Sequence, residues 1–123
     1  MVRFVYPVQT ENKPWLNSYP KNVPIKLEYL EVPLNAILEK TAKVNREKTA
    51  LTYFERSITY TELNSLSNQF AALLAALKVQ KGDRVAIFLP NIPQFVIAYY
   101  GILKAGAILT AISPLHKERE VSY

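Results

Sequence analysis

The chain has 123 residues, and the residue types that it lacks narrow its chemistry. It contains no cysteine, which excludes a thiol nucleophile, a zinc–thiolate site and a disulfide framework. Its three glycines, Gly82, Gly101 and Gly106, lie too far apart in the sequence to form a glycine-rich phosphate loop. A Ser-His-Asp triad would need the single histidine, His116, to meet the single aspartate, Asp83. The chain therefore carries few of the groups that enzymes use.

Charge and hydropathy indicate an ordinary globular chain. Half of the residues are hydrophobic, and the formal charge of +5 is spread along the sequence. Residues 1–48 hold eight Lys and Arg against five Glu, and residues 49–123 hold seven against five acids. Such scatter favours a solvated surface over a nucleic-acid-binding face, so we predict no nucleic-acid partner. The lack of cysteine fits a reducing cytoplasm, where we expect the protein.

One stretch, residues 95–112, approaches the length and apolarity of a membrane span, with eighteen residues and a single charge. Lys104 lies in its middle, where insertion costs about 2.5–3.5 kcal/mol, and Gly106 indicates a break. A buried helix followed by a buried strand explains the same residues without that cost. Residues 1–7 are interrupted by Pro7 and lack the apolar core of a signal peptide. We therefore predict no transmembrane segment.

The chain divides by composition into two parts. Residues 1–33 hold five of the eight prolines, together with Trp15, Tyr19 and Tyr29, and show no periodicity. This composition predicts an irregular arm that is rich in proline and aromatic residues. The arm is either held on a surface by its aromatic side chains or partly disordered. Residues 34–123 predict a partial α/β subdomain.

A helix and a hairpin open the second part. Residues of one helix face recur at spacings of three and four: Leu34, Ile37, Leu38, Thr41 and Ala42. Pro33 suits the first turn of this helix, which we expect to end near Asn45. Residues 50–54 and 57–60 then predict two short strands around Glu55-Arg56. This turn lacks the Asn-Gly or Asp-Gly pair that hairpins favour.

Helices and apolar strands alternate through the remainder. A helix with a capping box at Thr59 to Glu62 carries apolar residues three or four apart: Leu63, Leu66, Phe70, Leu73, Leu74 and Leu77. A turn at Lys81-Gly82-Asp83 precedes a strand over residues 84–89. Asn91 can cap the next helix, whose face is Phe95, Tyr99, Ile102 and Leu103, and Gly106 ends it before a strand over residues 107–112. A helical turn begins in residues 116–123. This order predicts an α/β fold with helices packed on a partly parallel sheet.

Candidate catalytic residues are few and isolated. His116 lies among charged residues with no partner pattern. Asp83 follows Gly82 in a tight turn, where aspartate commonly bonds nearby amides. Glu118 and Glu120 lie too near the chain end for a supported carboxylate pair, and Tyr99-Tyr100 has the spacing of core residues rather than of a stacking platform. We assign no catalytic, cofactor-binding or metal-binding residue.

An ordered series of short blocks resembles the opening of the AMP-forming acyl-CoA synthetase (adenylate-forming) superfamily and covers nearly all of residues 49–123. The blocks are Ser57-Ile58-Thr59-Tyr60-Thr61-Glu62-Leu63, Ser67-Asn68, Lys81-Gly82-Asp83-Arg84-Val85-Ala86-Ile87, Leu89-Pro90-Asn91, Gly101-Ile102-Leu103-Lys104-Ala105-Gly106-Ala107, Ser113-Pro114 and Arg119-Glu120-Val121. Lys13-Pro14-Trp15-Leu16, Tyr19-Pro20 and Val23-Pro24 resemble the leader of fatty-acid–CoA ligases. Relatives usually have glycine at Lys78, where lysine costs about 1 kcal/mol or forces a different helix exit, and proline at Asn45.

The resemblance implies an incomplete N-terminal portion of an adenylate-forming-enzyme large domain. Such enzymes activate a carboxylate with ATP and Mg, release pyrophosphate and pass the acyl group to coenzyme A. Their phosphate loop, ribose-binding aspartate, hinge and catalytic lysine lie downstream, so none is carried over to this chain, and the matching blocks are expected to be architectural. We expect no cofactor to bind to these residues alone.

Three hypotheses follow. The first is a truncated, N-terminal part of a fatty-acid–CoA ligase that is inactive alone. The second is a stand-alone α/β module that binds a partner through a sheet edge or its aromatic arm. The third keeps the enzyme class with an amino or aryl acid as substrate. Strands 84–89 and 107–112 are expected to be buried on both faces, so an apolar face is either covered by self-association or left exposed.

Overall fold

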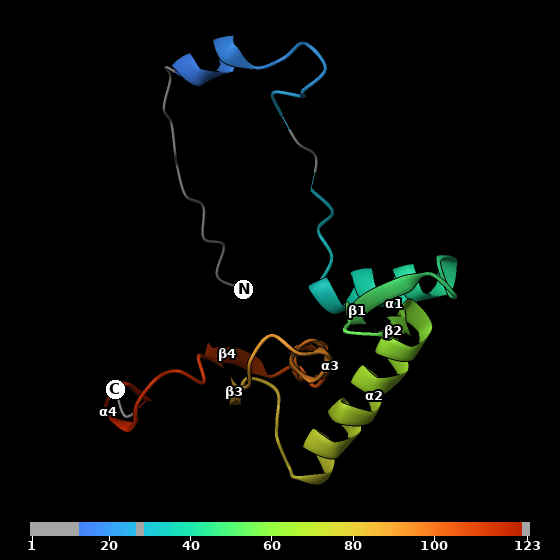
Figure 1. The fold of residues 1–123 in the computed structure, drawn as a ribbon, viewed down its shortest axis with the longest axis vertical. Helices are drawn as coiled ribbons and strands as arrows, with labels where there is room; N and C mark the ends of the chain where they lie inside the picture. Colours follow the sequence, from blue (N-terminus) through green and yellow to red (C-terminus); the bar gives the residue numbers. More distant parts are fainter. Residues whose placement is uncertain (1–12, 27–28, 122–123) are drawn as a thin grey trace. The chain divides into compact units, whose positions relative to one another are not determined.

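The computed structural model describes residues 13–26 and 29–121, and the chain divides between Glu31 and Val32 into two compact units (Figure 1). The described part of the first unit contains a 3-10 helix, Pro14–Ser18, which has proline in its first turn and no buried residue. The prediction that residues 1–7 are not a signal peptide lies outside the described residues. The aromatic arm over residues 1–33 stays a prediction.

The second unit has the predicted alternation of elements (Figure 1). In chain order these are α1 Leu34–Val44, β1 Thr49–Tyr53, β2 Arg56–Thr59, α2 Tyr60–Ala76, β3 Arg84–Phe88, α3 Pro93–Lys104, β4 Ile108–Ile112 and α4 Glu118–Val121. β1 and β2 form an antiparallel sheet, and β3 and β4 form a parallel one. The fold is therefore α/β, as predicted, although the antiparallel and the parallel strand pairs belong to two separate sheets. No helix in the described part of the chain is long and apolar enough to cross a membrane.

The predicted face of α1 is only half buried. Extended backbone at Pro33 precedes the helix, and Asn45 ends it, as expected. Leu38 and Ala42 are buried, but Leu34 and Ile37 of the same predicted face remain more than two-fifths exposed. α1 packs against α2 and α3.

The hairpin turn lies one residue earlier than predicted. Tyr53 pairs with Arg56, so the turn residues are Phe54 and Glu55 rather than Glu55 and Arg56. Phe54 adopts a left-handed φ of 52° and is 85% exposed. Asparagine or glycine would favour this conformation, and their absence explains why the turn position could not be read from the sequence.

The capping box of α2 is confirmed. The Glu62 N–H donates to Thr59 Oγ1 at 3.2 Å, and the Thr59 N–H donates to Glu62 Oε2 at 2.8 Å. Leu63, Ser67 and Leu74 are the buried residues of the helix. The predicted apolar face is too wide, because Leu73 and Leu77 expose more than half of their surface.

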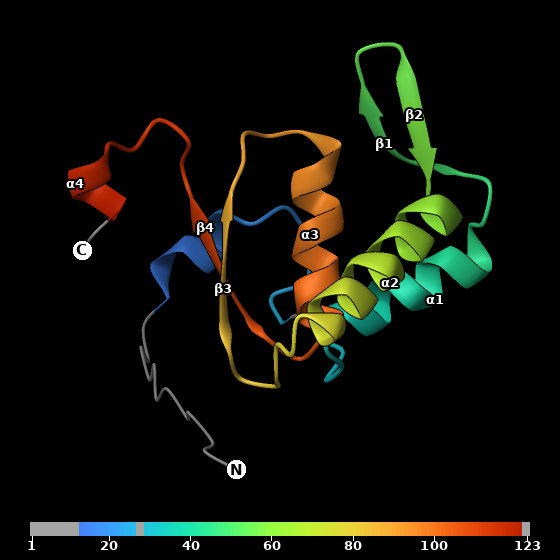
Figure 2. The same cartoon turned by 90° about the horizontal axis from the view of Figure 1, so that it is seen from below.

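β3, α3 and β4 form a parallel strand–helix–strand unit, with α3 lying against the strands (Figure 2). The prediction that Asn91 caps α3 is wrong. Ile92 is the N-cap and makes no side-chain cap bond. Pro93 follows it as the first helical residue, where its fixed φ starts the helix without a side-chain cap. Gly106, with a left-handed φ of 74°, lies just beyond the helix end at Ala105, as predicted.

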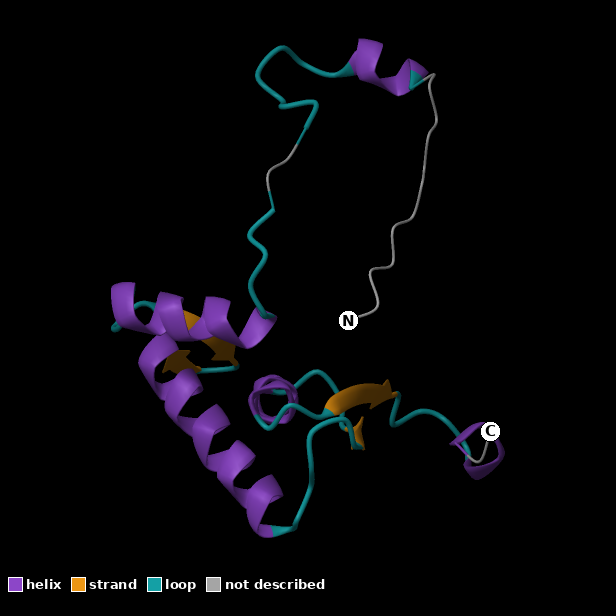
Figure 3. Ribbon diagram, turned by 180° about the vertical axis from the view of Figure 1, so that it is seen from behind, coloured by secondary structure: helices purple, strands orange, loops and turns teal. Residues whose placement is uncertain are grey.

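The core lies between α2, α3 and one face of the parallel sheet. Its buried residues are Leu74, Ile87, Ala98, Ile102 and Ala107, with the predicted residues Phe95 and Tyr99 packed against them. α2 and α3 approach closely at Gly101, where an added Cβ would lie 2.8 Å from Phe70 Cδ1 and 3.0 Å from the Ser67 carbonyl oxygen. Figure 3 shows these helices gathered on one side of the parallel strands. Glycine at 101 is therefore required by helix packing.

The strands are not buried on both faces. In β3 only Ile87 is buried, with Val85 partly covered, while Arg84, Ala86 and Phe88 are exposed. β4 likewise exposes Ile108 and Thr110. Helices cover one face of the sheet in the described part of the chain, and the apolar residues on the other face meet solvent. Self-association through this face stays a prediction.

Candidate functional site

An apolar groove of about 440 Å³ lies at the carboxyl ends of β3 and β4. Ligands of α/β folds commonly bind at this end of parallel strands, which makes the groove the first candidate site. Its lining comes from the end of β4, from the segments that follow the two strands and from the first turn of α3: Leu89, Pro90, Asn91, Phe95, Ala111, Ile112, Ser113, Pro114 and Leu115.

Short turns hold the two lining segments. After β3, the Ile92 N–H donates to the Pro90 carbonyl oxygen at 2.8 Å. After β4, Ser113 accepts twice: its carbonyl oxygen from the His116 N–H at 3.0 Å, and its Oγ from the Leu115 N–H at 3.2 Å. Because parallel strands end at the same edge, the turns bring Leu89-Pro90-Asn91 and Ser113-Pro114 to one groove.

A second groove, of about 310 Å³, adjoins the first. It lies between β1, which contributes Leu51 to Tyr53, and the start of α3. Asn91 and Phe95 line both grooves. The two together follow the start of α3 from the hairpin to the end of β4.

The lining of the two grooves is uncharged and holds few polar groups. It offers the Asn91 amide, the Ser113 and Thr52 hydroxyls and the Tyr53 phenol, but no charged side chain. An apolar group with one or two hydrogen-bonding atoms fits such a groove. Phosphates and a divalent cation do not fit it, because it presents no cation for the former and no carboxylate for the latter. Across the described ranges, no group of three or more His, Cys, Asp or Glu could hold a metal.

The residues weighed as candidates from sequence do not converge on this groove. The exposed His116 contributes its backbone N–H to the turn after β4. Asp83 accepts from the Gln80 N–H through its carboxylate at 2.8 Å, which is the turn role predicted for it. Glu120 accepts from the Lys117 N–H at 2.8 Å at the start of α4, and Glu118 lies exposed in the same helix.

The tyrosine pair belongs to the helix packing. Tyr99 and Tyr100 are partly buried, with ring centroids 5.7 Å apart in an edge arrangement, and Tyr99 packs against the core. Burial raises the pKa of Tyr100, with smaller contributions from Tyr99 and Tyr60.

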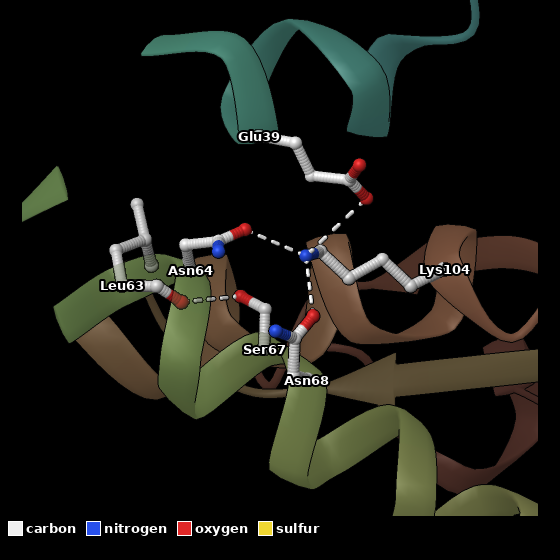
Figure 4. A network of polar contacts seen from close by, with 6 residues as sticks. All are labelled: Glu39, Leu63, Asn64, Ser67, Asn68 and Lys104. Carbon is white, nitrogen blue, oxygen red and sulfur yellow. Dashed lines mark hydrogen bonds and ion pairs between the residues drawn. The ribbon is translucent and has the colours of Figure 1, made fainter. Parts of the chain in front are cut away.

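A polar cluster around Lys104 was not found from the sequence, where this residue served to argue against a membrane span and formed part of one block of the resemblance. Its ammonium donates to Asn64 Oδ1 at 2.7 Å and to Asn68 Oδ1 at 2.5 Å, and lies 3.6 Å from Glu39 Oε1 (Figure 4). The Lys104 side chain is 6% exposed. The ammonium thus makes two hydrogen bonds and one ion pair, and the cluster joins α3 to both α1 and α2.

A buried serine lies beside this cluster. Ser67 is fully buried and donates from Oγ to the Leu63 carbonyl oxygen at 2.8 Å (Figure 4). No buried side-chain nitrogen or oxygen in the described residues lacks a partner. The signal that could have indicated the cluster is the resemblance itself, since Asn68 and Lys104 both lie in its blocks.

The blocks of the resemblance meet in pairs. Ser67-Asn68 contacts the block that contains Gly101 and Lys104. The Gly82 N–H donates to the Gly106 carbonyl oxygen at 3.0 Å, which joins the starts of the two parallel strands. The segments after the same strands share the groove. These contacts hold the blocks against one another, and an architectural role for all of them stays a prediction.

A family model for AMP-binding enzymes matches residues 38–123, which is most of the chain. This chain belongs to the AMP-binding enzyme family. The resemblance to adenylate-forming acyl-CoA synthetases is thereby confirmed. Two curated relatives are long-chain-fatty-acid–CoA ligases. That of Bacillus subtilis (strain 168) is 40% identical over 111 residues, and that of Salmonella typhimurium is 35% identical over 113 residues. Each alignment covers 90% of this chain and 20% of the relative.

Solved structures of this family share the fold. The Klebsiella oxytoca NpsA N-terminal subdomain has a TM-score of 0.71 at 28% identity, over 73% of this chain and 24% of that chain. The Mycobacterium tuberculosis fatty acyl CoA synthetase has a TM-score of 0.68 at 34% identity, over 72% of this chain and 18% of that chain. This chain spans about a fifth of the length of the curated relatives that it matches.

Proposed function

We propose that this chain is the N-terminal part of an ATP-dependent fatty-acid–CoA ligase. The complete enzyme would form an acyl-adenylate with release of pyrophosphate and then an acyl-CoA thioester. The supporting observation is the 40% identity to the Bacillus subtilis ligase, which extends over 90% of this chain and so includes part of the proline-rich arm. Fatty acids are the substrate class that this relative's name implies, and cytoplasm is the location that we propose for the enzyme.

Residues 1–123 alone are proposed to be inactive. The groove at the carboxyl ends of β3 and β4 has no charged lining, and transition-state stabilisation in phosphoryl chemistry needs positioned charge. ATP, magnesium and coenzyme A are therefore cofactors of the complete enzyme in this proposal. The part described here would supply a scaffold: two parallel strands, three packed helices and the polar cluster at Lys104.

A chimera tests this proposal. Residues 1–121 of this chain would replace the matching N-terminal segment of the Bacillus subtilis ligase, and palmitoyl-CoA formation would be measured with ATP, magnesium and coenzyme A. We expect an active chimera and no ATP–pyrophosphate exchange by the isolated chain. A matched chimera with Gly101→Val, which disrupts the contact between α2 and α3, should lose activity together with cooperative folding. A folded but inactive chimera, or exchange by the isolated chain, contradicts the proposal.

The second candidate is an enzyme for amino or aryl acids. It is favoured by the NpsA subdomain, which has been solved with 3-hydroxyanthranilyl-AMSN and has a TM-score of 0.72 to this chain at 28% identity. The same replacement made in NpsA discriminates the two candidates. Higher retained activity in the NpsA chimera than in the Bacillus chimera favours the aryl-acid candidate, and the reverse favours the fatty-acid ligase.

A further inference from the structure

The partners of Lys104 hold it with unequal strength. Asn64 and Asn68 belong to α2, and each accepts a hydrogen bond from the ammonium, at 2.7 Å and 2.5 Å. Glu39 belongs to α1 and lies 3.6 Å from the ammonium, and its side chain is 45% exposed, against 6% for that of Lys104 (Figure 4). Water can therefore replace the Glu39 carboxylate while both amide oxygens keep their hydrogen bonds to the buried charge.

Within the described residues, few contacts hold α1 to the other helices. Its buried residues are Leu38 and Ala42, and the core between α2, α3 and the parallel sheet contains no residue of α1. The ion pair between Glu39 and Lys104 is the only polar side-chain contact that joins α1 to α2 or α3 in that part of the chain. A segment with so little buried apolar surface opens more readily than the core elements.

The segment that follows α1 is bonded directly to the start of α2. The Thr61 N–H and hydroxyl both donate to the Arg46 carbonyl oxygen, at 3.3 Å and 2.9 Å. The Tyr60 N–H donates to the Lys48 carbonyl oxygen at 3.0 Å. None of these bonds involves a residue of α1, so they can persist while α1 moves away from α2 and α3. They place a hinge at residues 45–48.

We propose that α1 opens as a unit about the hinge at residues 45–48, and that the ion pair between Glu39 and Lys104 is the releasable contact that keeps it closed. In the open state Lys104 stays bonded to Asn64 and Asn68, so α2 and α3 remain packed. Because Glu39 is nearly half exposed, salt screens its attraction to the ammonium and favours the open state. The inference does not depend on the proposed ligase function.

Amide hydrogen exchange of the natural chain tests this opening helix by helix. We expect the amides of α1 to exchange faster than those of α2 and α3. Glu39→Gln removes the charge with little change in shape, so it should speed exchange in α1 by about three- to five-fold and leave the rates in α2 and α3 unchanged. Glu47→Gln is the matched control, because Glu47 is exposed beyond the end of α1 and the charge change is the same. Equal acceleration by both variants, acceleration in all three helices or no acceleration overturns the proposal.

Salt dependence separates the charge of Glu39 from the shape of its side chain. Raising potassium chloride from about 0.01 M to about 1 M shortens the Debye length from about 30 Å to about 3 Å. Exchange in α1 should then become faster in the natural chain and stay nearly constant in Glu39→Gln. The same salt response in both chains overturns the role of the ion pair.

Lys104→Met tests the part of the cluster that is proposed to stay fixed. This variant removes the hydrogen bonds to Asn64 and Asn68 together with the ion pair. Exchange should therefore become faster in α2 and α3 as well as in α1. Acceleration confined to α1 would show that the two amide bonds do not hold α3 to α2, and it would overturn the proposed division between fixed and releasable contacts.

Discussion

The ends of α2 and α3 form the same hydrogen-bonded motif with different residues. After α2, the Lys78 N–H donates to the Ala75 carbonyl oxygen at 2.9 Å and the Val79 N–H to that of Leu74 at 3.0 Å. After α3, Gly106 and Ala107 donate to Leu103 and Ile102, each at 3.1 Å. Both are Schellman motifs, in which the residue beyond the helix is left-handed. Lys78 has a φ of 63°, and Gly106 has a φ of 74°.

The comparison shows that packing, rather than glycine, fixes these exits. Leu74 and Ile102 are core residues, and Val79 and Ala107 pack with them, which supplies the hydrophobic contact that accompanies the motif. Lysine at 78 therefore adopts the left-handed exit expected of glycine, and the alternative of a different exit is wrong. Each exit leads into one of the parallel strands that flank the candidate groove. A left-handed lysine remains unfavourable by about 1 kcal/mol.

Truncation of the core residue at either helix end, Leu74 or Ile102, should destabilise that end. Ile102→Ala is expected to lower the free energy of unfolding by about 4 kcal/mol and Leu74→Ala by about 3 kcal/mol, because both leave cavities and Ile102 is fully buried. Urea denaturation followed by circular dichroism measures both values. Leu77→Ala, at a site two-thirds exposed beside the same exit, is the control and should change the value by less than about 1 kcal/mol. Equal effects of the three substitutions would show that core packing does not determine the conformation of these helix ends.

A side chain at Gly106 should strain the second exit. Gly106→Ala is expected to cost about 1–2 kcal/mol, because alanine is unfavourable at a φ of 74° and its Cβ would lie 3.3 Å from Lys81 Cγ. Thermal unfolding measures the loss. Adding Lys81→Ala removes the 3.3 Å contact with Cγ and leaves the Lys81 Cβ position at 3.5 Å, so it should restore only a small part of the stability. Full restoration would assign the cost to the contact and not to the left-handed backbone.

The reverse substitution should relieve the first exit. Lys78→Gly is expected to raise the free energy of unfolding by about 0.5–1 kcal/mol, since glycine adopts the left-handed conformation without a steric cost. Lys78→Ala keeps a Cβ and is the control, so it should leave the stability nearly unchanged. A stabilising alanine would show that the lysine chain, rather than the backbone conformation, is unfavourable.

Local signals made the helices and their ends predictable. The capping box at Thr59 and Glu62 and the stop at Gly106 depend on residues within one helical turn, so the sequence sufficed. At Lys78 the sequence left two alternatives open, a strained left-handed residue or a different exit, and the structure has the first. The turn at Phe54 and the cap of α3 were misplaced because each lacks the residue that normally marks it. Burial of β3 depends on what lies outside the described elements, and an apolar run such as Val85 to Leu89 does not indicate how many of its faces are covered.

The candidate groove and the polar cluster could not be derived from local patterns. The groove joins segments that follow different strands, and its uncharged lining gives no chemical signature. In the polar cluster, Lys104 contacts Asn64 and Asn68 from 40 and 36 residues away. Only the ordered blocks of the resemblance carried information about such distant contacts.

The start of α2, unlike the two helix ends, has a charged cap. We expect its contribution to stability to be the smallest of those predicted here. Hydrogen bonds from the Thr59 N–H and then from its hydroxyl lower the pKa of Glu62 below its usual value of 4.5. Because the pKa is lowered in the folded chain, the carboxylate adds stability above pH 4.5, and this stability is lost as the pH falls through the folded-state pKa. At the helix ends near Lys78 and Gly106 the hydrogen bonds join backbone groups, which do not titrate. These bonds therefore add no pH-dependent stability.

Glu62→Gln separates the charge of this cap from its hydrogen bonds, because glutamine can complete a capping box without titrating. The natural chain should therefore be more stable than the variant at pH 7, and the difference should shrink as the pH is lowered from 5 to 3. Urea midpoints at each pH measure it. Glu55→Gln, in the hairpin turn and away from any helix start, is the control and should not reproduce the trend. A difference that stays constant with pH would mean that glutamine forms a weaker cap at every pH and that the charge of Glu62 contributes nothing.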